Sequence, residues 1–160
     1  MATITKKTAY DRAMNGAPYG DLTALVFRMQ TNASGVLTGG DATAAIGDGD
    51  VVRIGKIPAG TKLLDSVVTI SDAFTASSTY KMGFQYVDGV DVTAVPQDDD
   101  YFTAASTALS SVAVQRKATT TAPVTLPKDA YLILTNAGAA QAAVGILDAV
   151  IIGQVVGIEA

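Results

Sequence analysis

The 160-residue sequence contains no cysteine, no histidine and no tryptophan. Without cysteine the chain forms no disulfide and offers no thiolate for catalysis or metal binding. The missing histidine removes the usual general base near neutral pH and the commonest metal ligand. The missing tryptophan weakens the case for a site that stacks on sugar rings. From these absences we expect a protein that is not an enzyme and that binds no metal and no cofactor.

Charged residues are also scarce, at 16% of the sequence against roughly 25% in an average domain. Lysine and arginine together number 11 and the acidic residues 15, which gives a net charge of −4. A nucleic-acid partner needs a basic stripe that displaces counterions, and the sequence has none, so we expect no nucleic-acid partner. A surface with so few charges is often partly covered by another protein.

Long hydrophobic runs are missing as well. The longest apolar tract, Val144 to Ile158, contains Asp148 and Gln154 and is shorter than the roughly 20 residues that a membrane-spanning helix needs. The N-terminal sequence MATITKKTAYDR lacks the hydrophobic core of a signal peptide. We therefore expect synthesis in the cytoplasm and no membrane partner.

The most regular pattern lies in residues 51–86. Two apolar runs, VVRIGKI and LLDSVVTI, are joined by a Pro-Ala-Gly turn and are followed by YKMGFQY. The last run alternates with period 2, as a half-buried strand does. Together with an Asp-Gly pair at 88–89, these runs predict a hairpin-rich sheet in which successive strands pair antiparallel. The predicted core face consists of Tyr80, Met82, Phe84 and Tyr86.

Further strands are predicted on both sides of this stretch, and a long loop rich in Gly, Ala and Thr is predicted over residues 31–50. The predicted strands are 21–30, 112–117, 131–135 and 144–158, the last with a possible bend at Gly153. No β–α alternation occurs. The fold class we predict is all-β, an antiparallel jelly roll or β-sandwich of about eight strands with one short helix and an extended N-terminal arm.

The short helix is predicted over residues 97–110. Asp98, Asp99 and Asp100 precede apolar residues at i, i+3, i+4 and i+7 spacing, which is a helical period. Carboxylates in a first turn interact favourably with the helix dipole, and aspartate is a good N-cap. We expect this helix to pack on a sheet edge or at the end of the sandwich.

We divide the chain into an N-terminal arm, residues 1–20, and a single jelly-roll domain, residues 21–160. The arm has no clear periodicity, but it carries Lys6, Lys7, Tyr10, Arg12 and Tyr19 within an otherwise acidic protein. It is either a frayed terminus or an arm that becomes ordered on a neighbouring subunit.

Three acidic groups are candidates for chemistry. Asp48 and Asp50 resemble part of a calcium loop, but the downstream ligands are missing, so a turn is the better interpretation. Asp88 and Asp91 flank a predicted hairpin tip, where aspartate is favoured for turn reasons. Asp98–Asp100 could bind a cation or a basic patch, although helix capping already explains them. No spacing selects a glycosidase pair, and no nucleophile elbow, P-loop or dinucleotide motif is present.

The order of elements resembles a family of small phage proteins. The run IGKIPAGTKLLDSVVTI from Ile54, the strand ending YVDG, then DDDYF from Asp98 and ALSS from Ala108 look like the jelly-roll proteins that decorate or cement tailed-phage heads, of the Bordetella-phage-type capsid cement family. The similarity covers roughly residues 51–157. It lies in element order and turn residues and in no active-site motif.

This resemblance implies a structural protein that binds the outer surface of the virion capsid and bridges neighbouring major capsid subunits. Its partners would be the major capsid protein and itself, as a homodimer or homotrimer, after synthesis in the host cytoplasm. Candidate contact residues are Lys6, Lys7, Tyr10, Arg12, Tyr19, Asp98, Asp99 and Asp100.

Two alternatives remain open. A carbohydrate-binding or adhesion module on a virion surface would need an exposed aromatic platform, for which Tyr19 and Tyr101 are the candidates outside predicted strands. A hydrolase is disfavoured because no catalytic constellation is present.

Overall fold

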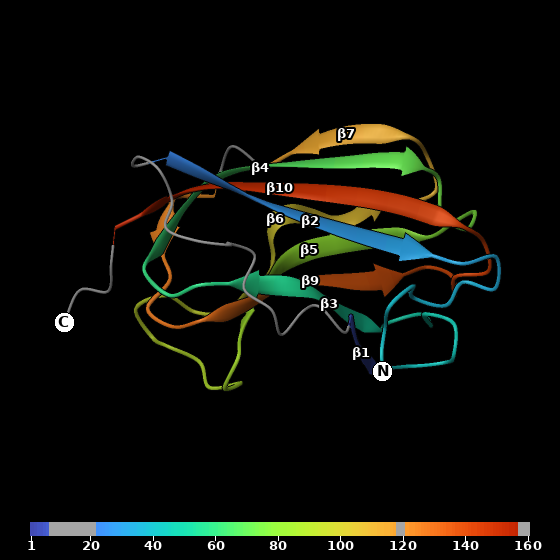
Figure 1. Ribbon diagram of the computed structural model, residues 1–160, viewed down its shortest axis with the longest axis horizontal. Coiled ribbons are helices and arrows are strands. Elements are labelled where there is room, and N and C mark those ends of the chain that lie inside the picture. The colour runs from blue at the N-terminus through green and yellow to red at the C-terminus, as the bar shows by residue number, and fades with distance from the viewer. Residues whose placement is uncertain (7–21, 118–120, 157–160) are drawn as a thin grey trace.

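The computed structural model describes residues 1–6, 22–117 and 121–156, which form a β-sandwich of two sheets (Figure 1). The strands are β1 (Thr3–Thr5), β2 (Leu22–Thr31), β3 (Val51–Ile57), β4 (Thr61–Asp72), β5 (Thr79–Tyr86), β6 (Asp98–Ala108), β7 (Ala113–Arg116), β8 (Val124–Thr125), β9 (Ala130–Ala137) and β10 (Gly145–Val155). The first sheet has the order β1-β3-β9-β5-β6, and the second sheet has the order β2-β10-β4-β7 with β8 attached to β4. The predicted all-β class is confirmed.

The strand count and the helix differ from the prediction. The described residues contain ten strands rather than about eight, and no helix. The two short strands β1 and β8 were not predicted because three and two residues are too few to show a period. Over the same residues, no helix is long and apolar enough to cross a membrane.

Strands β3, β4 and β5 lie in the first, second and first sheet respectively, so the predicted hairpin pairing of residues 51–86 is wrong. The turn at 58–60 is present, with a φ of 75° at Gly60, but it carries the chain from β3 in the first sheet to β4 in the second. Turn residues in a sequence indicate where the chain reverses direction. They do not indicate which strand the next strand will pair with. By crossing over, β3 and β4 each turn an apolar face toward one shared core.

For the next connection, the antiparallel pairing predicted from the Asp-Gly pair is confirmed. Strands β5 and β6 do pair antiparallel, but residues 87–97 join them instead of a two-residue hairpin turn.

The core between the sheets contains the side chains that the alternating patterns selected. Tyr80, Met82, Phe84 and Tyr86 of β5 are each at most 1% exposed, as predicted. Leu25, Phe27 and Met29 of β2 face them from the second sheet and are buried as well. Burial of one such side chain contributes roughly 1.5–3 kcal/mol, so this shared core is the main source of stability.

The predicted helix over residues 97–110 is wrong, because residues 98–108 form the edge strand β6. Its pairing with β5 is irregular, with register shifts between Tyr80 and Met82 and between Met82 and Phe84. Such bulges insert extra residues and break the period of 2, so the apolar positions acquired a spacing that mimics a helix. Gly83 permits the close approach, because a Cβ there would lie 2.0 Å from the carbonyl oxygen of Asp98.

Strand β10 lies at the centre of the second sheet, between β2 and β4. It is one extended strand, and the predicted bend corresponds to a register shift between Ile152 and Gly153 in its pairing with β4. Its inward side chains, Leu147, Ala149 and Ile151, are fully buried.

The loop predicted over residues 31–50 begins one residue later, because Thr31 ends β2, and it is fixed to the sandwich by the buried side chain of Asn136. The Asn136 Nδ2 donates to the carbonyl oxygens of Gly47 and Ala139, both at 2.8 Å, and its Oδ1 accepts from Gln141 Nε2 at 2.7 Å. One amide therefore joins the loop, the end of β9 and the segment before β10.

Replacing Asn136 with alanine should lower the free energy of unfolding by about 1–3 kcal/mol, because buried partners lose their hydrogen bonds. Chemical denaturation followed by circular dichroism measures this. Gln154→Ala, on the outer side of β10, is the control and should change the free energy of unfolding little. Equal stability of Asn136→Ala and wild type would contradict the role given to this amide.

Candidate partner-contact surface

Half of the eight predicted contact residues can be located. Lys7, Tyr10, Arg12 and Tyr19 lie outside the described residues. Lys6 follows β1, and Asp98, Asp99 and Asp100 begin β6. Because β1 and β6 are the two outermost strands of the first sheet, with β3, β9 and β5 between them, Lys6 and the three aspartates do not form one compact site.

Lys6 connects the two sheets at one side of the sandwich. Its backbone N–H donates to the carbonyl oxygen of Arg53 at 3.2 Å, and its Nζ donates to the carbonyl oxygen of Arg28 on β2 at 2.6 Å. Burial, and then the positive charge of Arg28, lower the pKa of Lys6, while Asp148 acts in the opposite direction. This lysine is already engaged within the protein, so it positions the start of the arm.

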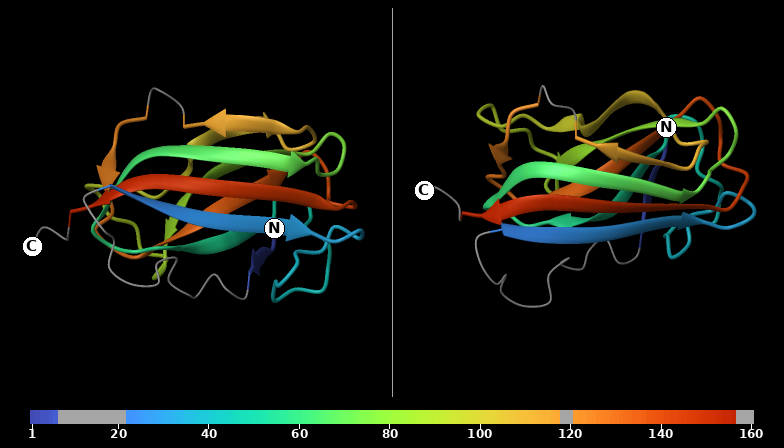
Figure 2. Two further views of the ribbon diagram at one scale, coloured as in Figure 1. Left: turned by 45° about the horizontal axis from the view of Figure 1, so that its top comes forward. Right: turned by 90° about the horizontal axis from the view of Figure 1, so that it is seen from above.

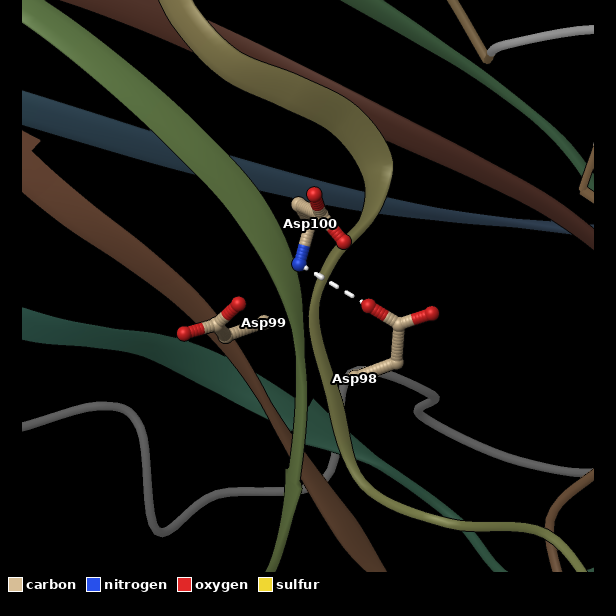
Figure 3. Close-up of side chains that lie close together, drawn as sticks. All are labelled: Asp98, Asp99 and Asp100. Carbon is tan, nitrogen blue, oxygen red and sulfur yellow. Dashed lines mark hydrogen bonds between the residues drawn. The ribbon is translucent and has the colours of Figure 1, made fainter.

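The three aspartates form an acidic cluster at the start of β6 (Figure 3). One carboxylate oxygen from each lies within 4.8 Å of the others. Asp98 Oδ1 accepts from the backbone N–H of Asp100 at 3.1 Å, and Asp99 forms an ion pair with Lys81 at 2.6 Å. Figure 3 shows Asp99 on the other side of the strand from Asp98 and Asp100.

Asp98 differs electrostatically from an exposed aspartate. Burial raises its pKa, and the adjacent Asp100 and Asp99 carboxylates add to the effect. The cluster therefore favours a positively charged group beside it. Its carboxylate oxygens suit a hard cation or the lysine and arginine side chains of a partner protein.

Beside the cluster, a hollow of about 560 Å³ lies on the outer face of the first sheet. It is lined by Met1, Val51, Lys81, Phe84, Gln85, Gln97, Asp98, Asp99, Ile133 and Thr135. The alternation of β5 had already placed Lys81 and Gln85 on the face away from the core. Their place in a hollow could not be predicted, because it depends on the pairing of β5 with β9.

The remaining acidic groups are used in turns, as the sequence indicated. Asp50 accepts from the backbone N–H groups of Ala2 and Gly47, and Asp48 accepts from that of Gly138. Asp88 accepts from the backbone N–H of Val90 and pairs with Lys128 at 2.8 Å. These contacts confirm the turn interpretation of both pairs.

Tyr101 does not supply an aromatic platform. Its side chain is 3% exposed and its ring packs edge-on against Phe84 and Phe102. Its hydroxyl donates to the carbonyl oxygen of Ala122 at 2.9 Å and accepts from Lys117 Nζ at 3.0 Å. Burial raises the pKa of Tyr101 to about 12. The expectation that Tyr101 lies outside the strands is wrong, because it belongs to β6.

The chain shares its fold with chains from two phage capsids. A chain of the capsid of Ralstonia phage GP4 superposes with a TM-score of 0.64 at 16% identity, covering 98% of this chain and 99% of that one. A chain of the cyanophage Pam1 capsid asymmetric unit superposes with a TM-score of 0.54 at 14% identity, covering 91% and 94%. No family model matches the sequence, and comparison with curated proteins found no match.

Replacing Asp98 with asparagine should stabilise the protein at neutral pH. The pKa of Asp98 is raised in the folded state, so its ionised form destabilises the fold. This destabilisation is complete at pH values above the pKa of Asp98 in the folded protein, and it vanishes below the pKa of Asp98 in the unfolded chain. Asp98→Asn keeps the oxygen that accepts from Asp100, so its melting temperature should exceed that of wild type at pH 7, with the difference lost near roughly pH 3.

Asp88→Asn is the matched control, since the hydrogen bond from Lys128 lowers the pKa of Asp88. Its effect at pH 7 should have the opposite sign. A lower melting temperature for Asp98→Asn at pH 7 would refute the assignment.

Proposed function

We propose that this chain is a structural protein of a tailed-phage head that binds the outer surface of the capsid and cements neighbouring major capsid protein subunits. The observation that carries the proposal is the fold shared with a Ralstonia phage GP4 capsid chain over almost the whole length of both chains. The protein acts without catalysis, as a symmetric oligomer, and remains on the virion.

The strand order supports the finer fold that the resemblance implies. The chain crosses between the sheets at each connection from β2 to β5, strands β5 and β6 pair within the first sheet, and the chain crosses again from β6 to β7. Strands β9 and β10 are central strands. An eight-stranded double sheet connected in this way has the connectivity of a jelly roll. Strands β1 and β8 are then additions to this framework.

A cement protein needs a stable scaffold and surfaces that bury area against other subunits. Many copies bind one closed symmetric shell, so the affinity of each single contact can be low while the total binding is strong. A protein that binds only the assembled shell stabilises that state by mass action. Residues that could move protons are not required for this role, which agrees with a sequence that contains no histidine and no cysteine.

The side that meets the capsid, in this proposal, combines the N-terminal arm with the hollow and the acidic cluster. Lys6 fixes the start of the arm at the β1 edge, and Lys7, Tyr10 and Arg12 of the arm are proposed to contact the capsid. Asp98–Asp100 lie across the same sheet, at its other edge. Separated basic and acidic regions would set the orientation of the protein on the capsid, because complementary charges fix the register of an interface.

The carbohydrate-binding alternative has less support. It needs an exposed aromatic platform, and Tyr101 is buried. Of its two candidates, only Tyr19, which is outside the described residues, remains.

Co-sedimentation with the cognate capsid shell tests the proposed function. Wild-type protein should sediment with intact capsids in a fixed copy ratio that saturates as more protein is added. Protein left free in the supernatant at all concentrations would refute the proposal, and affinity for a glycan under the same conditions would favour the alternative.

The double variant Lys7→Gln, Arg12→Gln tests the arm as the anchor. Neutralising two cations should weaken capsid binding several-fold and flatten its dependence on salt. Lys56→Gln, Lys128→Gln is the matched control, since it also removes two positive charges, both from pairs within the domain. Equal binding by the arm variant and the control would contradict the role of the arm.

A further inference from the structure

The outer face of the second sheet is unusually aliphatic for a surface. Val26 on β2 and Val114 on β7 are 63% and 66% exposed. Between these strands, Val150 of β10 and Val67 of β4 are half-buried and point away from the core. An antiparallel sheet with one face in solvent normally alternates apolar-in with polar-out, and here the outward positions are largely aliphatic too.

The pairing register makes these side chains contiguous. Val26 lies directly across from Val150, and Val150 directly across from Val67. Thr69, two residues further along β4, lies across from Val114 of β7. Figure 2 (left) shows β2, β10 and β4 as one continuous layer. Val26, Val150 and Val67 therefore form a row across β2, β10 and β4, and Val114 of β7 lies diagonally from Val67. We call these four valines and the surface around them the valine face.

The four charged side chains nearest the valines form two ion pairs. Arg28 Nε and Nη2 donate to the two carboxylate oxygens of Asp148 at 2.7 and 2.9 Å, a bidentate pair. At the end of the valine row, Arg116 of β7 lies directly across from Val67 and pairs with Asp65. These four residues contribute no net charge, although the whole chain carries −4.

The outer face of the second sheet, with the valine face on it, is large enough for a stable interface. The four strands contain 10, 11, 12 and 4 residues. With ~3.3 Å per residue and ~4.8 Å between strands, they cover roughly 600 Å². Two copies meeting through this face would bury about 1,200 Å² in total, which exceeds the roughly 1,000 Å² expected of a specific interface.

We infer that the valine face is covered by a second copy of this chain. Two acidic chains repel each other least through a region without excess negative charge, and the carboxylates nearest the valines are both paired with arginines. Permanent interfaces are also more apolar than those formed later with a separate partner. Before it binds a capsid, such a protein would therefore bury its most aliphatic face in contact with a second copy.

This inference deepens the proposed function by naming the surface through which copies join. Only the biological purpose of the oligomer rests on the proposed function, because self-association is measured on the isolated protein. Failure to bind capsids would leave it intact, and a monomeric protein could still bind capsids.

The experiment is light scattering coupled to size-exclusion chromatography on wild type, Val26→Lys, Val114→Lys and Val90→Lys. Wild type should have the mass of more than one chain. The first two variants bury an unpaired charge in the interface, so the dissociation constant of self-association should rise at least about tenfold. Each lysine also makes the chain less acidic, so stronger net repulsion cannot cause the loss.

Val90→Lys is the matched control. Val90 is 60% exposed in the β5–β6 connection, away from the valine face, and this variant should associate like wild type. Circular dichroism of all four proteins checks that they are folded. A monomeric wild type, or an oligomer that persists in both face variants, would overturn the inference. A capsid-binding defect of Val26→Lys in a monomeric wild-type background would assign the face to the capsid instead.

Discussion

The constraint on which the structure depends is that both sheets bury one face in a single core. Each strand of residues 51–86 has an apolar side that must be covered, and crossing between sheets at every turn lets one core cover them all. The central strands β9 and β10 then contact neighbours on both sides. Loops are fixed at the ends of this framework, as the buried Asn136 fixes residues 47–50.

This arrangement leaves two outer faces with different chemistry. The first sheet carries a hollow with Lys81, Gln85 and the acidic cluster at its edge. The second sheet carries the valine face, next to which Arg28 pairs with Asp148 and Arg116 with Asp65. A protein that both assembles with itself and binds a shell needs two such surfaces. The polar one suits a contact that forms late, and the aliphatic one suits a contact that is permanent.

The sequence predicted those strands whose residues alternate clearly between apolar and polar. It did not predict which strands pair with one another. Leu25, Phe27 and Met29 alternate cleanly, and so do Tyr80, Met82 and Phe84, and all six are buried. Strand β6 was mistaken for a helix because its bulges against β5 break the alternation, and bulges arise from pairing.

The candidate site was predictable only in part, for the same reason. The acidic cluster could be recognised from the sequence, whereas the hollow and the valine face each combine residues from four strands.

The most direct test of the proposed function is lysine acetylation footprinting of the protein, free and mixed with the capsid shell proposed as its partner, read by mass spectrometry. The account predicts that Lys7 of the arm and Lys81 beside the hollow lose reactivity on the capsid. Lys62, on the outer side of β4 in the second sheet, should react equally in both states. Protection of Lys62 alone, or unchanged reactivity of all three lysines, would contradict the account.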